Sequence, residues 1–240
     1  MAVYTIVEKT SLDKMIRSDP EYFNPKYNGC TKAIKKNDMK RIGDKEVAKL
    51  VTDGDHGNPE YTKNKTARYY IKSKELTSFG IDFETAEKVT DDYATKLGDR
   101  CVLHQGEVLL STVGTVGVPC VAIGDFPSSV LSRDIAKIVP NTTNILPEYL
   151  YIYLSTDFCQ LQIEREVSGS VQGGLYLHAL KKIAVLKAGI PFQKKIKKIV
   201  ENMIELNQKS KKLHDVGKKA VQLCIEENEE NAMAFLENSL

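Results

Sequence analysis

The feature that most constrains the fold is the stretch of residues 192–226, which contains no proline and a single glycine. Apolar and small residues recur along it in two rows spaced by seven, which is the pattern of a coiled-coil core. At 1.5 Å per residue, a helix of this length would be a rod about 50 Å long. Because a lone rod cannot bury its own apolar stripe, the pattern predicts a partner helix. The predicted contact positions are Ile196, Ile199, Met203, Leu206, Ser210, Leu213, Gly217 and Ala220.

The residues before this helix have the character of short strands joined by turns. Residues 147–167 place apolar side chains three and four apart, which predicts one buried helix. The expected fold class is α+β, with a β-rich globular domain over residues 1–190, a long coiled-coil helix over 191–228 and an acidic tail over 229–240. The predicted strands cover residues 4–7, 69–71, 107–113, 118–123, 130–139 and 183–186.

Charge is strongly segregated although the whole chain carries a net charge of only +2. Residues 181–219 hold 12 lysines against three acidic residues, and residues 26–74 hold 13 basic against six acidic residues. Residues 220–240 hold five glutamates and no basic residue. Two local basic surfaces suit a polyanion, which senses charge within about 10 Å at 0.1 M salt. Two solvated faces are an equally open interpretation.

Composition excludes several classes. No apolar run reaches the roughly 20 residues of a membrane-spanning helix, and residues 1–20 carry charges where a signal peptide would be apolar. The five cysteines are scattered without a CxxC pair, so neither a disulfide scaffold nor a zinc ribbon is expected. The chain is therefore expected to be cytoplasmic, away from membranes, and without a cofactor or metal.

No enzyme motif is convincing. The glycines at 114 and 117 lack the GxxxxGK[ST] pattern of a phosphate-binding loop. His104 follows Cys101 by three residues, which in an extended segment places the two side chains on opposite faces. Asp53, Asp55 and His56 leave a metal-dependent nuclease open as an alternative, although further spaced carboxylates and a lysine do not line up with them.

Six segments, in order, resemble one half of the specificity subunit of type I restriction–modification systems. One departure is Asp55, where the family's DGTHxxP turn has threonine. A second is the junction GIPFQKK at 189–195, where P-P-x-x-E-Q is common. A third is that the usual subunit has two such halves in tandem. The matching segments are RSDPEYFNPKY (17–27), DGDHGNP (53–59), GEVLLSTVGTVG (106–117), PEYLYIYL (147–154), GSVQ (169–172) and the L-x-x-i-x-i-P-x-x-x-Q-x-x-I pattern of 180–199.

The resemblance implies a subunit without catalytic activity that reads one part of a split site in double-stranded DNA. Its helix would act as a ruler and would dock methyltransferase (modification) subunits, and possibly a restriction subunit. One recognition domain with one orphan helix is expected to form a homodimer or to pair with a second half-subunit. The alternatives are the recognition domain of a fused N6-adenine methylase–nuclease, and an oligomeric scaffold whose lysine-rich helix binds acidic proteins and no DNA.

The predicted DNA contacts combine basic side chains that bind phosphates and position the domain with side chains able to read the edges of nucleobases. Arg68 could contact guanine, and Asn58 and Asn64 could contact adenine. Thr112 and Thr115 could donate to phosphate or cap their own loop, and Tyr69 and Tyr70 could stack on bases or pack within a strand. The predicted set is Asn58, Lys63, Asn64, Lys65, Arg68, Lys72, Lys74, Thr112, Thr115, Ser170 and Gln172.

Overall fold

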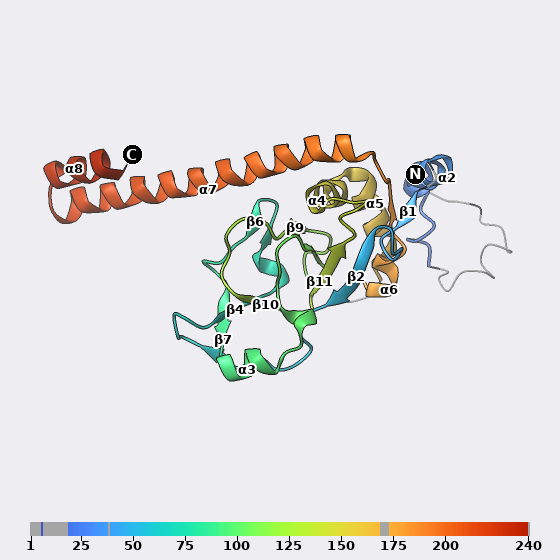
Figure 1. Cartoon of the computed structure of the whole chain (residues 1–240), viewed down its shortest axis with the longest axis horizontal. Helices are drawn as coiled ribbons and strands as arrows, with labels where there is room; N and C mark the ends of the chain where they lie inside the picture. Colours follow the sequence, from blue (N-terminus) through green and yellow to red (C-terminus); the bar gives the residue numbers. More distant parts are fainter. Residues whose placement is uncertain (1–5, 7–18, 38, 169–172, 240) are drawn as a thin grey trace. The chain divides into compact units, whose positions relative to one another are not determined.

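The computed structural model describes residues 6, 19–37, 39–168 and 173–239. The chain divides into two compact units, Met1–Lys197 and Lys198–Leu240. The α+β fold class is confirmed, with a sheet-rich first unit and the long helix α7 (Ile190–Glu226) near the C-terminus (Figure 1). Among the described residues, no helix is long and apolar enough to span a bilayer.

Two four-stranded sheets build the first unit. One is antiparallel, in the order β2-β11-β8-β9. The other has the order β10-β4-β7-β3, in which β10 and β4 run parallel. Their strands are β2 (Ala48–Asp53), β3 (Tyr61–Thr62), β4 (Arg68–Ile71), β7 (Glu87–Val89), β8 (Val108–Ser111), β9 (Pro119–Val121), β10 (Ser129–Leu131) and β11 (Ile135–Pro140).

The main core lies between these sheets. Ile71 of β4, Leu109 of β8, Leu131 of β10 and Ile135 of β11 are buried in one cluster. The predicted single strand over 130–139 is wrong, because a turn at residues 132–134 carries the chain from the second sheet into the first. The three turn residues, Ser132, Arg133 and Asp134, are all polar, but no glycine or proline among them marks the turn in the sequence.

Short elements surround the sheets. A second correction concerns residues 147–167, which form two helices because Thr156 is extended and caps the second one. The first of them, α4, lies against β8 and β9. The surrounding elements are η1 (Pro25–Tyr27), α2 (Asn28–Lys36), β1 (Lys40–Arg41), η2 (Ser73–Glu75), β5 (Leu76–Thr77), β6 (Gly80–Ile81), α3 (Asp91–Lys96), η3 (Asp99–Cys101), α4 (Pro147–Ser155), α5 (Asp157–Glu166), α6 (Leu177–Leu180) and β12 (Ala184–Val185).

The first turn of α7 is anchored in the first unit by Gln193, which is fully buried. Its Oε1 accepts from the Leu146 amide at 2.8 Å, and its Nε2 donates to the carbonyls of Asn144 and Ala188. Lys197 pairs with the buried Glu148 at 2.5 Å. These contacts hold the first two turns of α7 within the first unit.

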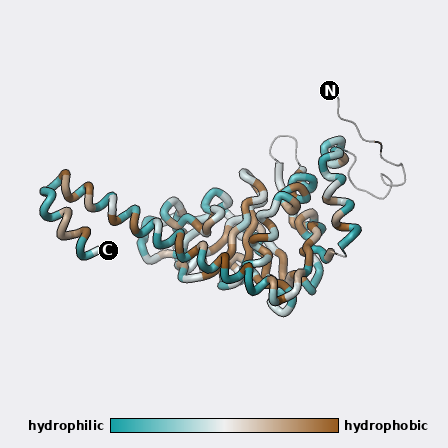
Figure 2. The backbone as a smooth tube through the Cα atoms, turned by 90° about the horizontal axis from the view of Figure 1, so that it is seen from above, coloured by the Kyte–Doolittle hydropathy of each residue, from teal (hydrophilic) through white to brown (hydrophobic). Residues whose placement is uncertain are grey.

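The second unit is a helical hairpin. Beyond Asn228, whose side chain caps the Asn231 amide at 2.9 Å, helix α8 (Glu229–Ser239) turns back beside the end of α7 (Figures 1 and 2). The segment expected to be an acidic tail is therefore mostly helical. Lys219 lies 4.9 Å from the Phe235 ring centre, and Ala220 and Ala232 are 4% and 5% exposed.

Candidate nucleic-acid interface

The 53–59 turn leaves the end of β2 and is held tightly against the β10–β11 turn. The Asp55 amide donates to the Leu131 carbonyl at 2.7 Å. A Cβ at position 54 would lie 2.1 Å from that carbonyl oxygen, so only glycine fits there. The turn is therefore fixed at its base, while His56, Gly57 and Asn58 are exposed.

Asp55 anchors the turn from below. Its carboxylate is 5% exposed and accepts from the Gly57 amide at 2.8 Å, from the Tyr70 hydroxyl at 3.1 Å and from the Tyr93 hydroxyl. Burial, together with the adjacent Asp55, raises the pKa of both tyrosines, so they remain protonated donors. Tyr70 is thus occupied inside the protein, which favours packing over base stacking.

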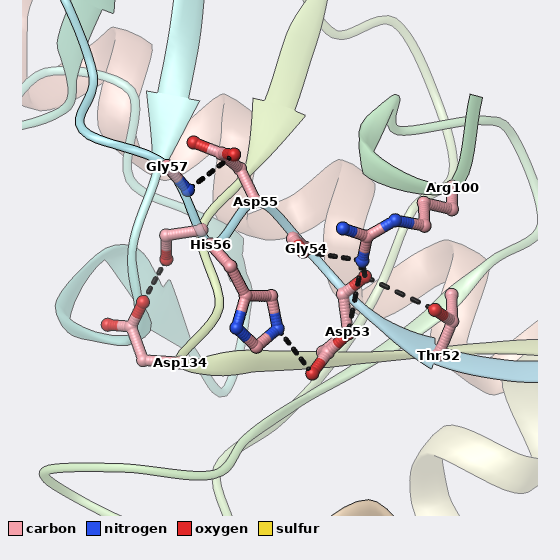
Figure 3. Close-up of polar contacts among 9 residues, drawn as sticks. Thr52, Asp53, Gly54, Asp55, His56, Gly57, Arg100 and Asp134 are labelled. Carbon is pink, nitrogen blue, oxygen red and sulfur yellow. Dashed lines mark hydrogen bonds and ion pairs between the residues drawn. The ribbon is translucent and has the colours of Figure 1, made fainter. Parts of the chain in front are cut away.

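Asp53 and Asp55 point to different partners, which does not suit a shared metal ion (Figure 3). Asp53 accepts from His56 Nε2 at 2.8 Å and from Arg100 Nη1 at 3.2 Å. The Arg100 guanidinium supplies the positive charge that a bound metal ion would otherwise bring to Asp53. Among the described residues, no group of three histidine, cysteine or acidic side chains is arranged to hold a metal.

The β3–β4 turn carries the exposed basic residues Lys63 and Lys65, and neither has an ion-pair partner among the described residues. They line a groove of about 550 Å³ together with Tyr69, Phe83 and Lys88. Lys88 lies 4.3 Å from the Tyr69 ring centre. Phe83 and Lys88 were not among the predicted residues. Phe83 packs against Tyr69 with 5.2 Å between ring centres, and Lys88 of β7 lies opposite Tyr69 of β4.

Asn64 lies at the tip of this turn and closes it. Its Oδ1 accepts from the Thr66 amide at 3.1 Å and from the Thr66 hydroxyl at 3.0 Å. Bidentate contact with adenine needs that oxygen as an acceptor as well as the amide group as a donor. Within the described part of the chain, the Nδ2 group of Asn64 is unengaged but the oxygen is not, so reading adenine would require the Asx turn to open.

The other predicted basic residues do not share the groove. Arg68 is half-buried and pairs with Val89 of β7. Because successive side chains of a strand point to opposite faces, Arg68 faces away from Tyr69 and the groove. Lys72 is paired with Glu87 at 2.5 Å and lies over the Tyr61 ring, and exposed Lys74 is 3.3 Å from Glu75. Ion pairing lowers the positive charge that Lys72 and Lys74 can offer to a ligand.

The remaining predicted loop contacts lie elsewhere. Thr112 is buried at the end of β8, beside the 53–59 turn, whereas Thr115 is exposed in the next turn and accepts from the Ser111 hydroxyl through its carbonyl. Ser170 and Gln172 fall outside the described residues.

In the isolated chain, the middle part of the predicted α7 seam is exposed to solvent. Ile199, Leu206 and Leu213 are 62%, 64% and 45% exposed. Ser210 and Gly217 are also exposed, and Ile196 and Met203 are intermediate. Ala220 differs from the rest, since it is buried where α8 turns back.

Comparison with solved structures shows the fold. A chain from a study of complex assembly and conformational transition of the type I R-M system matches with TM-score 0.50 and 16% identity, over 84% of this chain and 45% of that one. The S subunit of a type I restriction–modification system from M. genitalium matches with TM-score 0.50 and 12% identity, over 83% and 47%.

A third match is the type IIG restriction endonuclease BpuSI, with TM-score 0.54 and 8% identity, over 81% of this chain and 30% of that enzyme. The chain thus spans less than half the length of these solved structures. No curated protein matches it. The family model for the type I restriction modification DNA specificity domain matches residues 15–216, and the chain belongs to that family.

Proposed function

We propose that this chain is the DNA sequence-recognition subunit of a type I restriction–modification system. It reads one part of a split target, has no catalytic activity and works in the cytoplasm. The observation that carries this proposal is the family match over 15–216, which spans the sheets and most of α7. The exposed, unpaired Lys63 and Lys65 beside an aromatic groove suit contact with phosphates.

Helix α7 is proposed to couple this reader to the rest of the complex. Its open apolar positions offer a seam for a second half-subunit, and the same helix would dock a methyltransferase subunit. In a twofold pair the two helices would run antiparallel, so the DNA target would have two symmetric parts.

The decisive experiment is selection of bound sequences from a random DNA pool, using the chain together with its methyltransferase subunit. A defined two-part motif is expected. Replacing Lys63 and Lys65 with glutamine should lower the slope of log affinity against log salt by about two, since each phosphate contact contributes about 0.9. Replacement of Lys35 and Lys36 on α2 is the matched control. A pool without enrichment would contradict the proposal and favour the scaffold alternative.

A second candidate is the recognition part of a fused methylase–nuclease. The structural match to BpuSI favours it, because that enzyme contains the same fold within a chain more than three times the matched length. A longer open reading frame encoding a methylase would support this candidate. A separate neighbouring methyltransferase gene would support the subunit instead.

A further inference from the structure

A second cleft, of about 660 Å³, lies in the first unit beside the 53–59 turn and was not anticipated from the sequence. Strand ends and turns that are distant in sequence meet there, including parts of the 53–59 and 106–117 segments. Its lining includes Asp53, His56, Thr112, Arg133, Asp134 and Tyr176.

The floor of the cleft is held by backbone hydrogen bonds between these segments. The Asp55 amide donates to the Leu131 carbonyl at 2.7 Å, and the Thr112 amide donates to the Asp134 carbonyl at 2.8 Å. The Leu175 amide donates to the Thr112 carbonyl at 2.9 Å. The backbone of this floor is therefore preorganised, which lowers the entropy lost when a ligand binds.

The acidic groups of the cleft are already satisfied by the protein. Asp134 accepts from the Ser73 amide at 3.1 Å, from the Ser73 hydroxyl at 3.0 Å and from the Ser132 hydroxyl. Asp53 is held by His56 and Arg100. Both carboxylates are thus held in place by donors of the protein, and the charge of Asp53 is also paired with the Arg100 guanidinium.

Arg133 is a cationic residue of the cleft that these contacts do not engage. It lies at the centre of the β10–β11 turn, is exposed, and has no hydrogen-bond or ion-pair partner among the described residues. Tyr176 also lines the cleft, and its side chain is 60% exposed and stacked on His178 with 5.9 Å between ring centres. A planar guanidinium and an exposed aromatic ring that line the same cleft suit a sugar–phosphate chain.

We propose that this cleft holds the DNA backbone, with Arg133 contacting a phosphate and Tyr176 lying against the adjoining sugar. This proposal rests on the proposed DNA-reading function and adds residues to it. His56 lines the cleft and Asn58 follows it within the same turn, so the backbone contact would set the register in which Asn58 meets a base edge.

The test is the salt dependence of DNA binding by the full chain, measured for target and random duplexes. The variant Arg133→Gln should lower the slope of log affinity against log salt by about one. It should also lower the affinity for both duplexes roughly tenfold. Arg133→Lys should retain the slope, because it keeps the charge. The matched control is Arg41→Gln, an exposed arginine on β1 outside the cleft.

Three results would overturn the inference. An unchanged slope for Arg133→Gln would exclude a phosphate contact. A loss confined to the target duplex would assign Arg133 to base reading. Unchanged DNA binding with impaired methyltransferase assembly would assign the cleft to a protein partner. If the wild-type chain and Arg41→Gln show no preference for any sequence, it is the proposed function that fails, and this proposal fails with it.

Discussion

Two aspartates position the loops on which the proposed recognition depends. Asp55 and Asp134 each accept several hydrogen bonds, including donations from serine or tyrosine hydroxyls. Each is next in sequence to an exposed residue that lines the cleft, His56 and Arg133 respectively. The exposed side chains are therefore carried on backbone that is already fixed before any ligand arrives.

Removal of one hydrogen-bond donor to Asp55 should measurably lower the free energy of unfolding. Tyr93→Phe deletes a hydroxyl that donates to the buried carboxylate, and loss of such a bond costs about 1–3 kcal/mol. We expect urea denaturation to show this loss, together with weaker DNA binding through a looser turn. Tyr69→Phe is the control for stability alone, because the Tyr69 hydroxyl has no hydrogen bond among the described residues. Equal stability of the two variants would mean that Tyr93 does not anchor the turn.

The Asp134 carboxyl should make stability depend on acid pH. Burial alone would raise its pKa, but donation from Ser132 and from the amide and hydroxyl of Ser73 outweighs burial, so the pKa lies below the usual 3.8. A lowered folded-state pKa stabilises the protein above about pH 4, and this stabilisation is lost as the pH falls through the folded-state value.

Asp134→Asn should therefore be less stable than wild type at pH 7, and the gap in urea midpoint should shrink between pH 5 and pH 3. The exposed Asp125 is the control, and Asp125→Asn should follow the wild-type curve throughout. A gap that stays constant with pH would show that the Asp134 charge does not contribute to folding.

Residue identity alone did not indicate these roles. Arg133 looked like one position of a continuous strand, and its exposure depends on the turn that sends the chain to another sheet. Lys137 appeared to be an ordinary strand residue, yet it is 1% exposed and paired with Glu107 at 2.9 Å. The pairing of β10 with β4, and of β11 with β2 and β8, creates both situations, and these partners are distant in sequence.

At the scale of elements, the sequence predicted best where periodicity is long. The long helix was expected over 191–228 and is found at Ile190–Glu226, because a heptad pattern over many turns has few competing structures. Local capping was harder to foresee. Thr156 accepts from the Cys159 amide at 3.2 Å and starts α5, although the apolar pattern continues across it.

Helix α8 was not predicted, because the five glutamates of residues 220–240 suggested a solvated tail. Its burial depends on small residues, with Ala232 of α8 and Ala220 of α7 almost inaccessible. Ala232→Glu should force a carboxylate into this contact and open the hairpin. Hydrogen exchange should then become faster in residues 216–239.

The matched control for this element is Ala234→Glu, because Ala234 is exposed on the same helix. It adds the same charge and should leave exchange unchanged. Similar exchange in the two variants would show that α8 does not depend on packing against α7.

At the scale of the whole molecule, the two proposed interactions should respond to salt in opposite directions. Binding to DNA weakens as salt rises, because counterions compete for the phosphates. Pairing of two α7 helices brings together two copies of a segment with nine lysines and four acidic residues over 190–226. Their repulsion is screened by salt, since the Debye length falls from about 10 Å at 0.1 M to about 3 Å at 1 M.

Self-pairing through α7 should therefore strengthen with salt and depend on Leu206. Light scattering during size exclusion should show a larger dimer fraction at 0.5 M than at 0.05 M salt at micromolar concentration. Leu206→Asp, at the centre of the exposed seam, should give a monomer at both salt concentrations. Gln208→Asp adds the same charge two residues away on the outer face of the heptad and should still dimerise. A wild-type monomer under both conditions would exclude self-pairing, and a different helix would then have to cover Ile199, Leu206 and Leu213.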